Sequence, residues 1–314
     1  MKQIDCLCLG ISLLDLTISG FDVDFFNRDN VPIDGIYSFA GGDATNQAII
    51  LNRMGLDIQL NALIGKDDIA DVLTAKLMHN GLSLKSLRTS EEVKTSISII
   101  FVKDNGKRNI ISQRGNNYEF DETHIDFKAI KNARALSIGS IYGCIKLEPN
   151  GIKKALKAAK ENGATTFADL AEDKRNEKLN GLKSYINLID YFIPSYDQAS
   201  DITGETEPEK IIKRIKNIGA RNAILKLGET GLLIDTEDFK GHINGFKTGK
   251  IVDTTGAGDA FLACFIYSIL DGNGVKKAAE FAACGAAVSC KFMGANTAPL
   301  SMELINDYMK KGHG

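Results

Sequence analysis

Residues 251–265 read IVDTTGAGDAFLACF and join a glycine-rich turn to the start of an apolar helix. The turn contains Gly256 and Gly258, and Asp259 follows directly. Backbone N–H groups at the start of a helix lack partners within the helix, and the helix dipole adds positive charge, so phosphate groups bind there. Glycine also lets an anion approach the backbone closely. The segment therefore indicates an anion site, although an aspartate that only stabilises the helix N-terminus fits the same pattern.

The rest of the chain alternates short apolar runs with longer amphipathic segments. We expect buried strands at 4–10, 58–65, 133–139, 164–170, 188–194 and 222–228. Helical periodicity, closed by glycine, predicts helices within 43–55, 68–81, 148–163 and 206–219. Such alternation is typical of an α/β fold with a doubly wound, mainly parallel sheet flanked by helices. We find no linker, so a single domain over residues 1–314 is expected.

Two segments, at about 13–40 and 92–115, interrupt this alternation. The second alternates isoleucine with serine and contains an Asn105–Gly106 turn, which predicts a β-hairpin. Strands that interrupt a doubly wound pattern pair with one another outside the main sheet. We therefore expect a small β-strand lid over the carboxyl ends of the main strands, where such sheets bind ligands.

Composition excludes several classes of protein. The 314 residues carry a net charge of -2, and the 38 lysines and arginines form no long run, so nucleic-acid or membrane binding has no electrostatic basis. The six cysteines show no CxxC pair or metal-ligand spacing and are expected to be reduced thiols. Asp5 and Asp15 interrupt the N-terminal apolar stretch, which disfavours a signal peptide. A cytoplasmic protein without a membrane partner is expected.

Two further segments carry candidate binding residues. In AGGDATNQAIILNRMG, residues 40–55, Gly41 and Gly42 precede a helix that begins near Asp43, and Asn46 lies one turn in. Backbone and amide groups there could bind a polar ligand, or Asp43 could simply cap the helix. Asp15 follows the first strand and could hold two hydroxyl groups, or could be a turn residue.

The combination of these motifs is more specific than any of them. A Gly-Gly-x-x-x-Asn helix start and an Asp-Thr-x-Gly-Ala-Gly-Asp helix start, in an α/β chain of this length, resemble the ribokinase (PfkB-type) family of carbohydrate kinases. The resemblance covers essentially the whole chain, including the closing GANTAPL at 294–300. No GxxxxGK[ST] loop and no protein-kinase motif set is present, so the helix start after Thr255 has to bind the phosphates.

The resemblance implies a role for each matching residue. It makes Asp259 the general base and the backbone of Gly256, Ala257 and Gly258 the anion hole. It places Asp15, Gly41, Gly42, Asp43 and Asn46 around the sugar. It assigns Lys226, Gly228 and Gly231 to the ATP phosphates and ribose, and Ala283 to the adenine. Asp253, Thr255 and Gly294 match a monovalent cation site that uses K+, although many members work without one. The cofactors implied are ATP and Mg2+, and the lid is expected to be mobile or to form a homodimer contact.

One departure from the family concerns magnesium. The usual Asn-x-x-Glu stretch is replaced by Ser195 and Gln198, so the carboxylate that organises Mg2+ through its waters is missing. Mg2+ prefers oxygen ligands and keeps most of its waters. Gln198 could still hydrogen-bond those waters without adding negative charge, and Asp169 or Asp197 could supply the missing carboxylate.

The acceptor is the least determined feature. Phosphosugar kinases and ribokinases of the family often carry lysine at the position of Asp43, so a neutral monosaccharide is the leading expectation. Arg108 and Arg114 lie in the lid, and Arg114 could bind the carboxylate of a 2-keto-3-deoxy sugar acid. A nucleoside such as adenosine is a further alternative, with Ile97, Ile99 and Phe101 facing the base. A catalytically weakened regulator that binds sugar or nucleotide is the alternative from another class.

Overall fold

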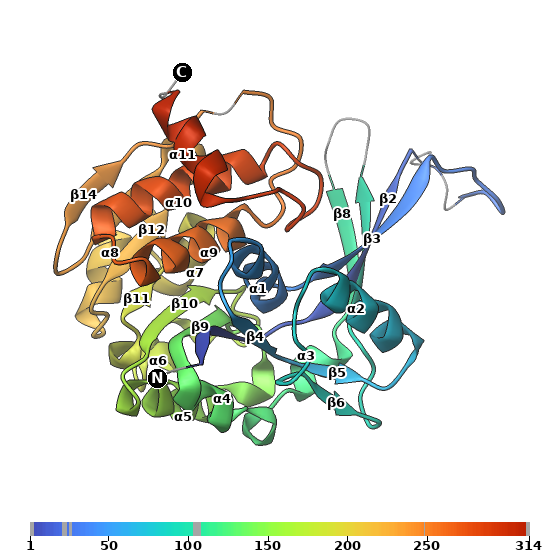
Figure 1. The fold of residues 1–314 in the computed structure, drawn as a ribbon, viewed down its shortest axis with the longest axis horizontal. Helices are drawn as coiled ribbons and strands as arrows, with labels where there is room; N and C mark the ends of the chain where they lie inside the picture. The colour runs from blue at the N-terminus through green and yellow to red at the C-terminus, as the bar shows by residue number, and fades with distance from the viewer. Residues whose placement is uncertain (1–2, 21–23, 25–26, 103–107, 248, 312–314) are drawn as a thin grey trace.

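The computed structural model describes residues 3–20, 24, 27–102, 108–247 and 249–311 (Figure 1). Its main sheet has the strand order β14-β13-β12-β11-β10-β9-β1-β4. The strands are β1 (Ile4–Leu9), β4 (Ile58–Asn61), β9 (Ala133–Ile141), β10 (Thr165–Leu170), β11 (Tyr191–Phe192), β12 (Ala223–Lys226), β13 (Leu232–Asp235) and β14 (Lys240–Ile243). In this order, the six strands from β12 to β4 are parallel to one another, and β13 and β14 are antiparallel strands at the other edge. The predicted mainly parallel sheet is confirmed.

Helices cover both faces of this sheet (Figure 1). They are α1 (Asp43–Arg53), α2 (Asp68–His79), α3 (Gly115–Glu119), α4 (Phe127–Asn132), α5 (Asn150–Glu161), α6 (Lys178–Leu182), α7 (Tyr196–Thr203), α8 (Pro208–Asn217), α9 (Ala257–Leu270), α10 (Val275–Ser289) and α11 (Met302–Lys310). Alternation along β1 places Cys6 and Cys8 in the core under α1, α9 and α10, and Leu7 and Leu9 in the core under α4, α5 and α8. Among the described helices, none combines the length and the apolar character that a membrane span requires.

A second sheet of four strands, in the order β3-β2-β7-β8, projects beyond the main body (Figure 1). It consists of β2 (Leu13–Ser19), β3 (Gly35–Gly41), β7 (Ile97–Val102) and β8 (Arg108–Gln113). The pairs β2–β3 and β7–β8 are antiparallel, and a parallel pairing of β2 with β7 joins them. The predicted small β-strand sheet formed by the two interrupting segments is confirmed. The Asn105–Gly106 turn lies outside the described residues.

Two element predictions need correction, and one hairpin was missed. The run at 58–65 is two strands, because β5 (Leu63–Gly65) leaves the main sheet and pairs with β6 (Arg88–Ser90). Both strands are buried, so the apolar run continues across the break. The run at 188–194 yields only the short β11, since a 3-10 turn ends at Leu188. The β13–β14 hairpin was not predicted from the sequence.

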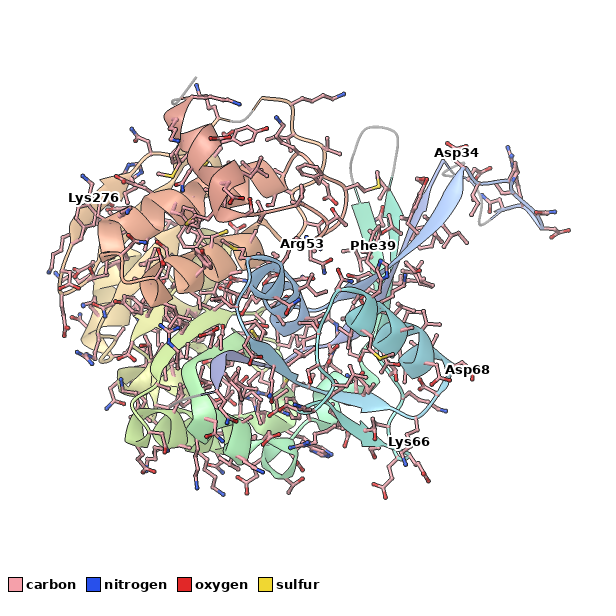
Figure 2. The ribbon with its side chains drawn as sticks, in the orientation of Figure 1. Asp34, Phe39, Arg53, Lys66, Asp68 and Lys276 are labelled. Carbon is pink, nitrogen blue, oxygen red and sulfur yellow. The ribbon has the colours of Figure 1, made fainter. Side chains whose placement is uncertain are left out.

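The end of α1 is tied to the loop that precedes α11. Arg53 donates through Nη1 to the carbonyl oxygens of Asn296 and Ala298, at 2.7 and 2.6 Å (Figure 2). This contact joins the GANTAPL segment to the helix that begins at Asp43. The two motif regions at opposite ends of the chain are therefore held against one another.

Candidate active site

One cavity of about 310 Å³ lies between the four-stranded sheet and the carboxyl ends of the main strands. Of the residues predicted from the sequence, it is lined by Asp15, Gly42, Asp43, Asn46, Arg114, Gln198, Thr255, Gly256 and Asp259. Ser98, Ser112, Tyr118, Tyr142, Glu172 and Lys174 also line it and were not predicted. The cavity therefore brings the two glycine-containing helix starts together.

Asp259 is placed by the turn that starts α9. Gly256 precedes the helix with φ 73°, and a methyl group on it would lie 2.5 Å from the Ala295 carbonyl oxygen, so only glycine fits. Asp259 lies in the first helical turn and is 7% exposed. Asn46 donates through Nδ2 to Asp259 Oδ2 at 2.8 Å, and Gln47 donates through Nε2 to Oδ1 at 3.3 Å. The carboxyl group is thus buried and bonded on both oxygens.

Burial raises the pKa of Asp259 well above its usual range, and the nearby Asp43 carboxylate raises it further. The hydrogen bonds from Asn46 and Gln47 act in the opposite direction. A carboxylate with a raised pKa is a stronger proton acceptor than an ordinary aspartate. Asp259 therefore has the environment of a general base.

The N-terminus of α9 offers positive potential beside this carboxylate. The Ala257 N–H donates to the Thr254 carbonyl at 3.3 Å, so this amide is partly engaged. Within the described ranges, the amides of Gly258 and Asp259 donate to no backbone carbonyl. Lys226 reaches the same turn, because a methyl group on Gly258 would lie 3.2 Å from Lys226 Nζ. Amides, helix dipole and ammonium together form a site suited to phosphate.

Lys226 also forms an ion pair with Asp169 at the end of β10. Both side chains are nearly buried, with exposed fractions of 11% and 10%. Burial raises the pKa of Asp169, and the Lys226 charge partly offsets this effect. A carboxylate and an ammonium group are thus held next to the predicted anion hole.

Two more carboxylates and one guanidinium face the cavity. Burial raises the pKa of Asp15 to about 7, the Asp43 charge adds to the rise, and Arg114 opposes it. Asp43 accepts a hydrogen bond from the Ser140 hydroxyl, and burial raises its pKa as well. A methyl group on Gly41 would lie 2.0 Å from Asp15 Oδ2, so glycine is required for Asp15 to occupy its place.

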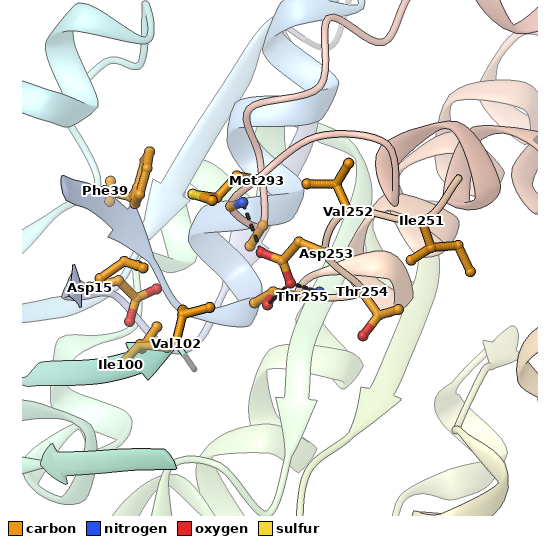
Figure 3. A pocket seen from close by; sticks show the side chains of 14 residues that line it. Asp15, Phe39, Ile100, Val102, Ile251, Val252, Asp253, Thr254, Thr255 and Met293 are labelled. Carbon is orange, nitrogen blue, oxygen red and sulfur yellow. Dashed lines mark hydrogen bonds between the residues drawn. The ribbon is translucent and has the colours of Figure 1, made fainter. Parts of the chain in front are cut away.

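A second cavity of about 330 Å³ adjoins the first and shares Asp15 and Thr255 with it (Figure 3). Asp253 lies on its wall and accepts from the Thr255 N–H and the Gly294 N–H, each at 2.9 Å. The three residues predicted to bind a monovalent cation are therefore close together. In this structure the Asp253 carboxylate joins the loop before α9 to the loop after α10. The cation site stays a prediction.

The predicted nucleotide-binding residues lie outside both cavities described above. Gly228 (φ 63°) and Gly231 (φ 108°) form the turn between β12 and β13. A methyl group on Gly231 would lie 2.0 Å from the Ile243 carbonyl oxygen. Close packing against this backbone is therefore enough to explain why position 231 is glycine. Ala283 lies in α10 and packs in the core. Contact of these residues with a nucleotide stays a prediction.

Gln198 serves as part of a helix cap. Its Oε1 accepts from the Ser195 N–H at 3.2 Å and from the Ser195 hydroxyl at 2.5 Å, at the start of α7. The oxygen that would accept hydrogen bonds from magnesium-bound waters is therefore engaged. Of the two carboxylates proposed to replace it, Asp169 lies at the anion hole, because a methyl group on Gly258 would be 3.8 Å from its Oδ2.

The prediction that Ile97, Ile99 and Phe101 face the acceptor is wrong. Ser98 pairs with Asp15 in the register of β2 and β7, so Ser98 and Ile100 share the face of Asp15. Alternate side chains of a strand point to opposite faces, which turns the three predicted residues away from the cavity. Of the two lid arginines, Arg114 lines the cavity, and the side chain of Arg108 lies outside the described part of the structure.

Two buried amides at the site were not predicted. Asn296 donates through Nδ2 to Asn46 Oδ1 and to the Ala40 carbonyl, both at 2.7 Å. Gln47 bonds Asp259 from the neighbouring position on α1. The sequence contained weak signals for both, since Gln47 follows Asn46 and Asn296 lies within GANTAPL.

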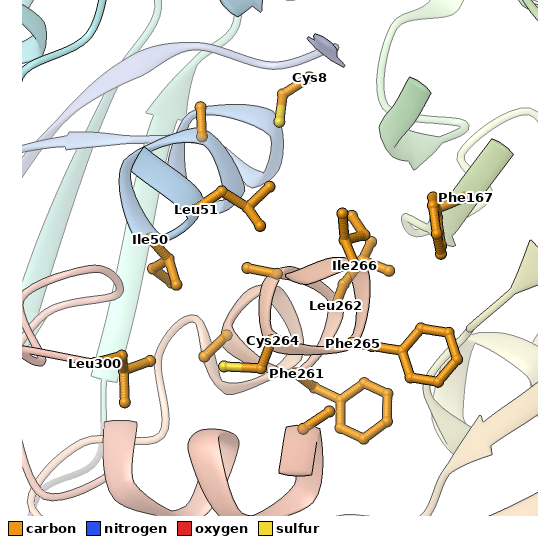
Figure 4. Close-up of a cluster of buried hydrophobic side chains, with 14 of the residues drawn as sticks. Cys8, Ile50, Leu51, Phe167, Phe261, Leu262, Cys264, Phe265, Ile266 and Leu300 are labelled. Carbon is orange, nitrogen blue, oxygen red and sulfur yellow. The ribbon is translucent and has the colours of Figure 1, made fainter. Parts of the chain in front are cut away.

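The helix that carries Asp259 is held by apolar packing. Phe261, Leu262 and Phe265 belong to one buried apolar cluster with residues of α1, α10 and the main sheet, and Phe265 meets Phe167 edge to face at 6.2 Å between ring centroids (Figure 4). Aromatic pairs of this geometry add to the stabilisation from buried area. The base is therefore fixed to a rigid element.

Comparison with known proteins agrees with this geometry. The model of the pfkB family carbohydrate kinases matches residues 3–301. The chain is 25% identical over 300 residues to the ATP-dependent 6-phosphofructokinase of Thermoanaerobacterium thermosaccharolyticum, covering 94% of this chain and 90% of that protein. It is 27% identical over 268 residues to a probable fructokinase-5 of Arabidopsis thaliana, covering 80% and 82%.

Among solved structures, the ribokinase of Arabidopsis thaliana complexed with ribose and ATP superposes with a TM-score of 0.84. It is 20% identical in sequence, over 98% of this chain and 99% of that chain. The fold is thus that of ribokinase. The chain belongs to the PfkB family of carbohydrate kinases. It is accordingly an ATP-dependent kinase that acts on a carbohydrate.

Proposed function

We propose that this kinase phosphorylates a hydroxyl group of a neutral monosaccharide, with Asp259 as general base and the first turn of α9 as anion hole. The observation that carries the proposal is the placement of Asp259. Its carboxyl group is buried in the cavity wall, has a raised pKa, and adjoins helix amides that donate to no backbone carbonyl among the described residues.

The reaction follows from these positions. Asp259 takes the proton of the sugar hydroxyl as the hydroxyl oxygen forms a bond to the γ-phosphorus. The bond between the γ-phosphorus and the oxygen bridging to the β-phosphate breaks, and ADP leaves. The Gly258 amide and the Lys226 ammonium stabilise the charge on the transferred group, as is typical of phosphoryl transfer. The four-stranded sheet covers the sugar and excludes water, which would otherwise be a competing acceptor.

Charges in the cavity favour a neutral acceptor. Asp15, Asp43 and Glu172 line it together with Arg114 and Lys174, so acidic side chains outnumber basic ones before Asp259 is counted. A carboxylate or phosphate on the acceptor would meet repulsion that the two basic side chains only partly offset. Hydroxyl groups can donate to Asp15 and Asp43 without this cost.

Mg2+ would bind at this site together with the nucleotide. In the described residues, no cluster of three acidic, histidine or cysteine side chains is arranged to hold a metal ion by itself. This fits Mg2+, which binds proteins through one or two carboxylates together with substrate phosphates and waters. Asp169 is the residue that would hold it, through water, and the ion would neutralise phosphate charge.

The test is a screen for ADP release with purified protein. Neutral sugars, sugar acids, phosphosugars and nucleosides are compared as acceptors, each with and without potassium. The proposal predicts the highest kcat/KM for a neutral monosaccharide. A preference for a sugar acid or a nucleoside would overturn the assignment of the acceptor, and activity on none would favour the weakened regulator.

A further inference from the structure

Gln47 lies behind the base and lines neither cavity described above. It is fully buried on α1, next to Asn46. Its Nε2 donates to the Gly139 carbonyl oxygen at 3.2 Å and to Asp259 Oδ1 at 3.3 Å. Its Oε1 accepts from the Ser137 hydroxyl at 2.7 Å. The side chain therefore links α1, β9 and α9.

These partners allow only one orientation of the amide. The Gly139 carbonyl can accept a hydrogen bond but cannot donate one. A reversed amide would place Oε1 against this carbonyl and against Asp259 Oδ1, which pairs acceptor with acceptor. The two N–H groups match the two acceptors, and Ser137 satisfies the oxygen. A fully satisfied buried amide is a rigid support.

We propose that Gln47 is a positioning residue, which holds Asp259 Oδ1 so that the carboxylate keeps its direction toward the acceptor. The inference rests on the proposed role of Asp259. Asn46 holds Oδ2, so the two neighbouring amides of α1 fix the plane of the carboxyl group. Gln47 does so without contacting the acceptor, because it is absent from the cavity wall.

The surroundings of Asp259 explain why such a donor is needed. Asp43 on α1 and Asp169 on β10 both disfavour its charged form, and burial disfavours it most strongly. Cys8 on β1 is neutral, because its pKa is raised well above the usual value. Lys226 on β12 is the nearby cation, and it is paired with Asp169. Hydrogen bonds from Gln47 and Asn46 therefore help to keep the base ionised.

The test compares Gln47→Met with the unchanged enzyme. Methionine has a similar length and no N–H group, so the pKa of Asp259 rises further. We expect kcat to fall about tenfold at pH 6 and to recover as the pH rises, because a general base must be ionised. KM for the acceptor should change less than twofold. Ser137→Ala removes the hydrogen bond to Gln47 Oε1 and keeps the two acceptors of Nε2, so it should shift the pH profile in the same direction by less.

Asn61→Leu is the matched control. Asn61 is equally buried, and its amide bonds the carbonyls of Ser86 and His124, away from Asp259. It should lower Tm without moving the pH profile. Unchanged profiles in Gln47→Met and Ser137→Ala, or an equal shift in Asn61→Leu, would overturn the proposal.

A second measurement separates this proposal from the proposed function. Carboxyl carbons of aspartate are labelled with 13C, and the Asp259 signal is assigned by its loss in Asp259→Asn. Its titration should move to higher pH in Gln47→Met, whether or not an acceptor has been found. A protein without kinase activity that still shows this shift would refute the proposed function and retain the role of Gln47. A titration that does not move would refute the role of Gln47 alone.

Discussion

At the residue scale, the site contains four buried carboxyl groups, and ionising them there is energetically unfavourable. Asp15, Asp43, Asp169 and Asp259 all have a raised pKa because they are buried near one another. Burying a carboxylate is unfavourable unless donors or cations compensate. Proteins accept such costs at functional sites, where the perturbed group has a task.

Asp259→Asn tests the assignment of the base. Asparagine keeps the shape of the side chain and removes the proton acceptor, so kcat should fall by about a hundredfold to ten-thousandfold. Binding of ATP, measured by calorimetry, should persist. The exposed Asp71 on α2 provides the control, and Asp71→Asn should leave kcat unchanged. Near-normal turnover of Asp259→Asn would mean that another group takes the proton.

At the scale of elements, the sequence was most informative where a local pattern decides the structure. The helix starts at Asp43 and Ala257 were predictable, because glycine and the following apolar period act locally. The β13–β14 hairpin was missed because β14 is only four residues long and has little apolar pattern, although its pairing is local. The roles of Gln47 and Asn296 were missed because their partners lie far away in the chain.

Gln198→Glu tests the start of α7. A glutamate would keep the cap with Ser195 and add a negative charge at a helix N-terminus, which contributes about 0.3–1 kcal/mol. It would also restore a carboxylate near the predicted magnesium position. We expect a lower half-saturating magnesium concentration in kinase assays and a slightly higher Tm. The exposed Glu209→Gln, in the first turn of α8, is the control for general charge effects. Magnesium titrations that coincide for Gln198→Glu and the unchanged enzyme would contradict the prediction.

At the scale of the whole molecule, the raised pKa values make the free energy of unfolding decrease as the pH rises. An acid whose pKa is higher in the folded than in the unfolded state binds its proton more tightly when folded. Stability therefore falls as the pH rises from the unfolded-state pKa to the folded-state pKa. For Glu148, buried beneath Tyr142, the folded pKa is about 8. For Asp15 it is about 7.

We therefore expect the free energy of unfolding to decrease from about pH 5 to about pH 9, measured by urea titration. Glu148→Gln should flatten this decrease. Glutamine keeps the acceptor for the Tyr142 N–H, and among the described residues Glu148 Oε2 has no hydrogen-bond partner to lose. The exposed Glu161→Gln should have the same slope as the unchanged protein. Equal slopes in all three would show that Glu148 titrates normally.

The four-stranded sheet has large apolar side chains that are more than half exposed to solvent. Ile36 of β3 and Ile111 of β8 are 60% and 58% exposed and lie on the face of the sheet that is turned away from the cavity, whereas Ile110 lines the cavity. Exposed apolar side chains on one face mark an interaction surface. The prediction of a homodimer through this sheet is tested by sedimentation. Ile36→Lys should convert a dimer to a monomer, whereas Val72→Lys on α2 should not. A monomeric unchanged protein would refute it.

The parallel contact between β2 and β7 has a consequence for how the chain assembles. β2 meets its antiparallel partner β3 early in synthesis, whereas β7 emerges only after α1, β4, β5, α2 and β6. Contacts between distant segments are slow to form, because closing the intervening chain costs entropy. The covering sheet is complete once β8 has emerged, before β9 to β14 and α4 to α11 of the body have been made. The acceptor cavity therefore closes only when the turn that carries Thr255 and Asp259 has been made and packs beneath this sheet.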